Sequence, residues 1–181
     1  MFANAPDLIA WFPEPDGLPR PDWKAIREFI RSNTTPEHFN GAYEEITRIW
    51  LQKTCDRLGG AYAVAESENF CLLSELEEKQ RNELLSFLEQ CRTRIIRTLA
   101  DISLPARNGK HVVMRFSTAD EYYRYVPFFY DDGSWADSPG IFLQSAGYMH
   151  IAYYHDDRMG SDRSLLAHEL THWLVCRYRS G

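Results

Sequence analysis

The stretch Leu165–Val175 reads LLAHELTHWLV, and the rest of the fold is organised around it. His168 and His172 are four residues apart, so in a helix both imidazoles project from one face and can hold one zinc ion. Glu169 follows the first histidine and is close enough to act on a zinc-bound water. Apolar residues flank this polar group on both sides, as in a helix that lies against a core. The stretch predicts a metal site, unless the spacing is accidental.

Composition bounds the class of protein. A chain of 181 residues with 44% hydrophobic and 25% charged residues is long and apolar enough for one domain with a real core, and a disordered chain is excluded. The net charge is −6 and no basic patch stands out, so nucleic acid is not expected as a partner. No apolar run reaches the roughly 20 residues of a membrane span. The N-terminal residues lack the basic and apolar regions of a signal peptide, which favours a cytoplasmic location.

The cysteine pattern agrees with that compartment. None of the four cysteines lies in a C-x-x-C spacing. We interpret them as buried thiols of a reducing compartment. A disulfide between two of them stays open as the alternative. The cysteines are Cys55, Cys71, Cys91 and Cys176.

Hydrophobic periodicity and turn residues predict helices and strands in alternating groups. The first 21 residues carry five prolines and predict an extended arm. Helices are expected from Asp22 to about Ser32, from Thr35 to about Leu58, from Leu76 to Leu99, from Ser117 to about Tyr125, and from Ser161 or Asp162 through the H-E-x-x-H stretch. Strands are expected at Tyr62–Glu66, Phe70–Leu73, His111–Phe116, Gly140–Gln144 and Tyr148–Tyr154.

This order predicts an α+β fold with a mixed sheet, because the strands cluster and long helices do not separate them one by one. We expect residues 1–60 to form an N-terminal arm and helical segment, and residues 61–181 to form the core that carries the H-E-x-x-H helix. The two parts are expected to make one compact domain overall.

From about Ser67 onward the layout resembles the gluzincin-type zinc metallopeptidases, the peptidase MA-like family. A long helix precedes the strand His111–Phe116, an aromatic helix follows around Tyr122, and the strand Met149–Tyr154 leads into the H-E-x-x-H helix. The resemblance implies a zincin-like N-terminal half, in which a mixed sheet packs on the long helix and on the H-E-x-x-H helix. It also implies that the strand before that helix edges the active-site cleft and pairs with an extended peptide.

The same resemblance implies roles for three residues. His168 and His172 would be ligands of a Zn²⁺ cofactor, and Glu169 would be the general base that polarises the zinc-bound water. The substrate would be a peptide or protein. A catalytically inactive zincin-like module with a binding or regulatory role is the alternative, so whether the chain is an enzyme stays open at this stage.

The third ligand is not assigned by the sequence. A catalytic zinc usually has three protein ligands and one open position. Metzincins would need a glycine at position 175 and a histidine at position 178, and this chain has Val175 and Tyr178 there. Gluzincins take a glutamate from a later helix, but no carboxylate follows Glu169. The chain therefore looks truncated after the H-E-x-x-H helix, and we expect low or absent peptidase activity from these 181 residues.

Other sources of the third ligand are alternatives, and so is a site that holds little or no metal. A partner chain could supply the ligand, or the loop before the final helix could. The candidates in that loop are His155, Asp156 and Asp157. The apolar N-terminal arm packs on the domain in one interpretation and covers the cleft as a pro-segment in another.

Overall fold

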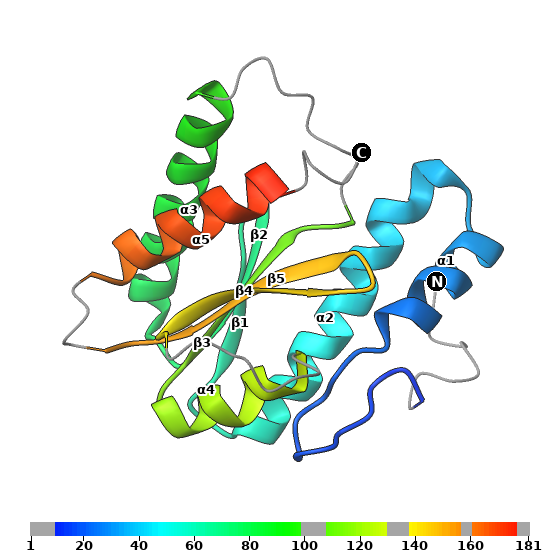
Figure 1. The fold of residues 1–181 in the computed structure, drawn as a ribbon, viewed down its shortest axis with the longest axis horizontal. Helices are drawn as coiled ribbons and strands as arrows, with labels where there is room; N and C mark the ends of the chain where they lie inside the picture. The colour runs from blue at the N-terminus through cyan, green and yellow to red at the C-terminus, as the bar shows by residue number, and fades with distance from the viewer. Residues whose placement is uncertain (1–9, 99–107, 130–137, 157–160, 177–181) are drawn as a thin grey trace.

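A five-stranded mixed sheet lies at the centre of the chain, with helices on both of its faces (Figure 1). The structure, a computed structural model, describes residues 10–98, 108–129, 138–156 and 161–176. The strand order is β1-β2-β3-β5-β4. Neighbouring strands among β2, β3 and β5 are parallel, whereas β1 and β4 pair antiparallel at the two edges. The strands are β1 (Ala63–Glu66), β2 (Phe70–Ser74), β3 (His111–Phe116), β4 (Gly140–Ser145) and β5 (Tyr148–Tyr154).

The first face of the sheet is covered by α3 (Glu78–Thr98) and α5 (Asp162–Cys176), the helix that carries H-E-x-x-H. Both helices pack in one apolar cluster with side chains from β2, β3 and β5. Figure 1 shows α3 and α5 crossing on the same side of the strands. The residues of this cluster that come from α5 are spaced at three and four positions, which is the helical period of a buried stripe. They are Leu166, Leu170, Trp173 and Leu174.

The second face is covered by the N-terminal arm and three helices, which share a second apolar cluster. At its centre Trp23 stacks on Tyr148 with ring centroids 3.5 Å apart, and Trp50 meets the same tyrosine edge-on. Trp11 and Phe12 of the arm are buried in this cluster too. The helices are α1 (Trp23–Asn33), α2 (Phe39–Leu58) and α4 (Ala119–Tyr125), with short 3-10 turns at Pro36–His38 and Val126–Phe129.

Local residue chemistry explains where these helices begin and end. The Asp22 carboxylate accepts hydrogen bonds from the backbone N–H groups of Lys24 and Ala25, which caps α1. Gly59, with a φ of 97°, ends α2 in a conformation that favours glycine. The helix expected at Thr35 starts with a 3-10 turn and becomes α-helical only at Phe39.

The β4–β5 hairpin closes with a strained two-residue turn. Ala146 has a φ of 46° and Gly147 a φ of 82°, so both central residues lie in the left-handed region. Positive φ at both positions is the geometry of a type I′ turn, which matches the twist of the flanking strands. Gly147 adopts it freely, whereas the Cβ of Ala146 makes it unfavourable by about 1–2 kcal/mol.

The α+β class and the mixed sheet are confirmed. One expectation drawn from the family resemblance is wrong for the strand it named: β5 is an interior strand, and β4 is the edge strand on that side. The short connection between β4 and β5 puts them next to each other, and β5 pairs with β3 on its other side. The alternative in which the arm covers the cleft is also wrong for its described residues, because Trp11 and Phe12 pack on the face opposite α5.

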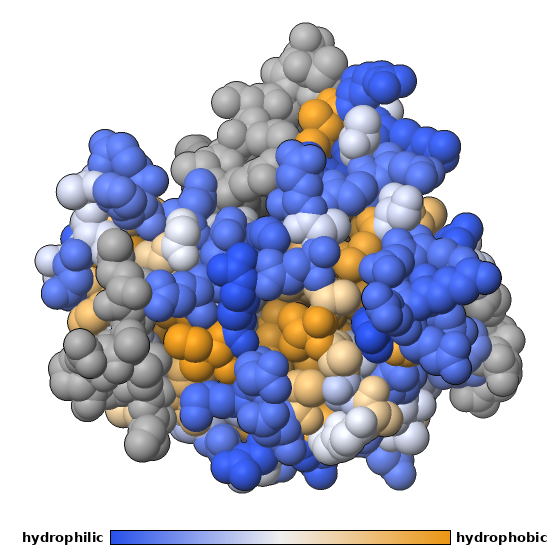
Figure 2. Space-filling model, turned by 180° about the vertical axis from the view of Figure 1, so that it is seen from behind, coloured by the Kyte–Doolittle hydropathy of each residue, from blue (hydrophilic) through white to orange (hydrophobic). Residues whose placement is uncertain are grey.

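Within the described ranges, no helix combines the length and apolar character needed to cross a bilayer. On the face drawn in Figure 2, hydrophobic residues reach the surface in small patches separated by hydrophilic ones. Such scattered patches are normal for folded proteins.

Gly140 sets the distance between α5 and the sheet, and its substitution by alanine tests this. A Cβ at Gly140 would lie 2.7 Å from Leu165 Cδ2 and 3.0 Å from Tyr153 Cβ. We expect Gly140→Ala to lower the free energy of unfolding by about 1–3 kcal/mol because the added methyl group forces these side chains apart. Urea unfolding followed by fluorescence measures the change.

The matched control is Gly41→Ala in α2, where an added Cβ meets nothing within 4 Å. This change should raise the free energy of unfolding by about 0.5–1 kcal/mol, because alanine is the better helix former. A Gly140→Ala variant as stable as the parent would contradict the close approach of α5 to β4.

Candidate metal centre on helix α5

The structure brings His168 and His172 together on the solvent side of α5. Their Nε2 atoms are 3.0 Å apart and their ring centroids 4.5 Å apart. Both side chains are exposed. The i,i+4 spacing in a regular helix accounts for this proximity without any other contact. As a pair without metal, one ring nitrogen donates a hydrogen bond to the other.

Glu169 lies on the buried side of α5, next to the histidine pair. The Glu169 side chain is only 9% exposed, although the exposed His168 and His172 lie before and after it in the sequence. The backbone N–H of Phe142, on edge strand β4, donates a hydrogen bond to its carboxylate. An edge strand has backbone groups that no neighbouring strand uses, and Glu169 takes one of them. The contact places the carboxylate beside β4.

Burial raises the pKa of the Glu169 carboxyl above its ordinary value. The nearby imidazoles of His168 and His172, and the Phe142 N–H, act in the opposite direction but do not overcome it. A carboxyl group with a raised pKa exchanges protons more readily near neutral pH than an exposed one does. The site therefore combines two surface imidazoles with a partly desolvated acid one residue away.

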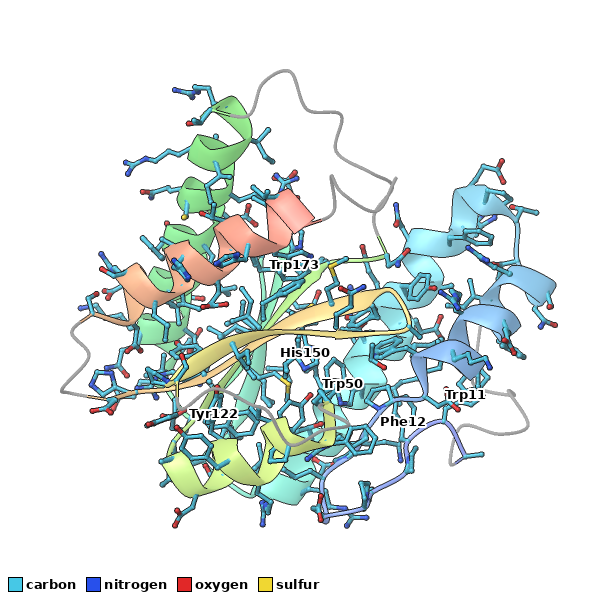
Figure 3. All side chains as sticks on the ribbon, in the orientation of Figure 1. Trp11, Phe12, Trp50, Tyr122, His150 and Trp173 are labelled. Carbon is cyan, nitrogen blue, oxygen red and sulfur yellow. The ribbon has the colours of Figure 1, made fainter. Side chains whose placement is uncertain are left out.

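Other side chains of α5 hold the helix in place. The Thr171 hydroxyl donates to the carbonyl oxygen of Ala167, one turn earlier in the helix, at 2.7 Å. Trp173 is buried and meets the ring of His111 edge-on, with centroids 4.2 Å apart. Figure 3 shows Trp173 between α5 and the strands. His111 thus belongs to the packing of α5.

His155, in the loop before α5, is held away from the histidine pair. His155 Nδ1 lies 2.6 Å from Asp162 Oδ1, and Asp162 is six residues before His168, which is about 9 Å along the helix axis. Arg115 Nε donates a hydrogen bond to the other carboxylate oxygen of Asp162 at 3.2 Å. The Arg115 guanidinium also forms an ion pair with Glu75. Asp157 lies outside the described residues. In the part of the chain that the structure describes, no three His, Cys, Asp or Glu side chains are grouped so as to hold a metal ion.

His150 is a sheet residue, as expected. It lies on the face opposite α5, near Trp50 (Figure 3), and its Nε2 is 2.8 Å from the Tyr125 hydroxyl. Complete burial, with a smaller contribution from Arg20, lowers its pKa to about 3, so the imidazole is neutral. This histidine therefore belongs to the second apolar layer and not to the candidate metal centre.

Three pockets lined by described residues lie away from the histidine pair. A pocket of about 880 Å³ lies along α3 and reaches Arg163, and one of about 290 Å³ lies beside His155 and Asp162. A third, of about 440 Å³, lies between α1, α2 and the β4–β5 turn. None of the three is lined by His168, Glu169 or His172.

Two features of the site were missed by reasoning from the sequence. The contact of Glu169 with the Phe142 N–H involves a backbone group, so no residue type in the sequence indicates it. The partly buried ion pairs of Arg115 with Glu75 and Asp162 connect the start of α5 to β3. A charged residue inside the apolar strand His111–Phe116 is the signal that could have predicted them.

Comparison with known proteins adds no assignment. No protein-family model, curated protein or solved structure matches this chain.

The raised pKa of Glu169 predicts that this carboxylate lowers stability at neutral pH. A group whose folded pKa lies above its unfolded value favours the folded state below the unfolded pKa, and that stabilisation is lost as the pH rises through the folded pKa. Glu169→Gln removes the charge and keeps the oxygen that Phe142 contacts. In metal-free buffer we expect the variant to unfold at a higher urea concentration than the parent at pH 7, and at the same concentration at pH 3, where the parent carboxyl is protonated.

Measuring the urea midpoint at both pH values checks this expectation. Glu83→Gln on the exposed side of α3 is the matched control and should leave the midpoint unchanged at either pH. A lower midpoint for Glu169→Gln at pH 7 would mean that ionised Glu169 stabilises the fold.

Proposed function

We propose that this chain is a zincin-like zinc metallohydrolase of the gluzincin type and that it acts on peptide bonds. In this proposal His168 and His172 bind Zn²⁺ and Glu169 is the general base. The observation that carries it is the placement of two imidazole Nε2 atoms 3.0 Å apart, one residue from a buried carboxylate.

The spacing of the imidazoles suits one ion. Zinc–nitrogen bonds of about 2.0–2.1 Å in a tetrahedral site hold two ligand nitrogens about 3.3 Å apart. The observed Nε2 separation of 3.0 Å is within a few tenths of an ångström of that value. A small rotation of either exposed ring would reach it, because neither ring is enclosed by the core.

The chemistry follows from the position of Glu169. Zinc held by His168 and His172 would supply Lewis-acid chemistry, lowering the pKa of a coordinated water toward neutrality. The Glu169 carboxylate accepts a proton from the attacking water and then donates it to the leaving nitrogen. Its raised pKa suits the first step, because a carboxylate of ordinary pKa accepts protons poorly at neutral pH. The hydrogen bond from Phe142 keeps the carboxylate oriented.

Strand β4 supports a peptide as the substrate. It is an edge strand, so an extended peptide can add to it through backbone hydrogen bonds. Glu169 contacts the middle of this strand, so a peptide paired there would run past the carboxylate. An antiparallel edge strand beside α5, with α3 next to it on the same face, also fits the zincin-like arrangement implied by the sequence.

The third ligand is part of the proposal. The described residues offer two ligands, and a catalytic zinc usually has three. We propose that the third comes from outside the described residues, with a partner chain as one source. The alternative function is a catalytically inactive zincin-like module that binds or regulates a partner, and the same two-ligand arrangement favours it.

A cytoplasmic location completes the proposal. Cys55, Cys71 and Cys91 are free thiols, and burial raises the pKa of each. Protonated, partly or fully buried thiols suit a reducing compartment.

Zinc binding tests the site directly. We expect the purified chain to bind one Zn²⁺ in isothermal titration calorimetry, and His168→Ala and His172→Ala to weaken that binding at least tenfold each, because each removes one of two ligands. His38→Ala is the control, since His38 is also exposed but lies at the start of α2. Equal zinc content in the parent and His168→Ala would remove the basis of the metal centre.

Hydrolysis separates the two candidate functions. We expect slow cleavage of casein by the zinc-loaded chain, which a chelator stops and Glu169→Gln abolishes without loss of bound zinc. We expect cleavage to be slow because the described residues supply only two of the usual three zinc ligands. Zinc binding with no cleavage above the Glu169→Gln background would favour the inactive module instead.

A further inference from the structure

The pocket of about 440 Å³ between α1, α2 and the β4–β5 turn carries an inference that is independent of the metal centre. It lies on the side of α1 and α2, whereas α5 packs on the opposite face of the sheet. Its volume is within the range of small-molecule sites. Ile30, Pro36, Phe39 and the ring of Tyr43 supply apolar walls.

Two arginines converge on this pocket from one helix. Arg27 and Arg31 are four residues apart on α1, so their like charges repel each other. Among the described residues neither has an ion pair with a carboxylate. Both act electrostatically on the Tyr43 hydroxyl, where they oppose the rise in its pKa that burial causes. Two unneutralised guanidinium groups beside a phenol form a local positive site in a chain whose net charge is −6.

The remaining polar groups leave further donors for a ligand. Arg27 Nη1 donates to the Ala146 carbonyl oxygen at 2.9 Å, which holds the guanidinium against the turn. Its other N–H groups have no hydrogen bond to a described residue. The Asn40 Oδ1 accepts from the Gly109 N–H at 3.4 Å, so the Asn40 NH₂ group remains as a donor. A pocket rich in donors is matched by a ligand rich in acceptors.

Rigid backbone frames this group of donors. Ala146, which positions Arg27, is the strained residue of the β4–β5 turn. Gly109 has a φ of 78°, and a Cβ there would lie 3.2 Å from the Glu44 backbone nitrogen. Asn108 binds the Gly147 carbonyl oxygen at 3.3 Å and joins these two turns. Preorganised donors bind an anion without the loss of conformational entropy that mobile side chains would suffer.

We propose that this pocket binds a small molecule in which an oxyanion, a carboxylate or a phosphate, is attached to an apolar or aromatic body. The oxyanion contacts Arg27, Arg31 and the Tyr43 hydroxyl. The body lies against Ile30 and Phe39.

Calorimetry with defined probes tests the site in the intact chain. Benzoate and phenyl phosphate carry the two oxyanions on the same ring, and benzyl alcohol is the neutral probe. We expect at least one of the two anions to bind and benzyl alcohol to bind at least tenfold more weakly. Arg31→Gln should weaken the bound anion about tenfold, because a charge-assisted hydrogen bond is lost. The tighter anion identifies the oxyanion that the pocket prefers.

Arg94→Gln is the matched control, because Arg94 is an exposed arginine of α3 and does not line the pocket. It removes the same charge and should leave the affinity unchanged. Arg27→Gln should weaken binding like Arg31→Gln, with the far-ultraviolet spectrum and urea midpoint showing that the fold is retained. Binding of neither anion, equal binding of benzyl alcohol, or equal affinities in Arg31→Gln and Arg94→Gln would overturn the proposal.

Discussion

The packing of helix α5 against edge strand β4 is the contact on which the candidate metal centre depends. Gly140 has no side chain, so Leu165 and the start of α5 come close to the strand. Further along, the carboxylate of Glu169 reaches the Phe142 N–H. The contact that buries one side of α5 therefore also buries Glu169 and raises the pKa of its carboxyl group. His168 and His172 remain exposed to solvent.

A sheet buried on both faces separates two kinds of chemistry. Every residue of β3 is buried, so each face of the sheet needs its own layer of helices. One layer carries α5 with its imidazole pair, and the other carries α1 with its arginine pair. The β4–β5 hairpin links them, because β4 contacts Glu169 and the turn at Ala146 holds Arg27. Both candidate sites thus meet the same edge hairpin from opposite sides.

Much of the fold could be predicted because its signals are local. Asp22 and Gly59 mark helix ends through the hydrogen bonds and φ angles they favour, and Ala146-Gly147 lies where the turn between two strands was expected. The H-E-x-x-H spacing predicted the approach of His168 to His172, because four residues of helix determine it. Strand order could not be predicted in this way. It depends on which strands pair, and β5 is interior because β3 pairs with its far side.

The sequence by itself determined the types of the elements, the α+β class and the proximity of the two imidazoles, since these follow from hydrophobic period, capping and helix geometry. Only the tertiary structure decided that Glu169 is buried against β4, that His155 is engaged by Asp162 far from the histidine pair, and that Arg27 and Arg31 share a pocket with Tyr43. The physical reason is that desolvation and long-range pairing depend on surfaces distant in the chain. Residue type and spacing carry information only about neighbours along one element.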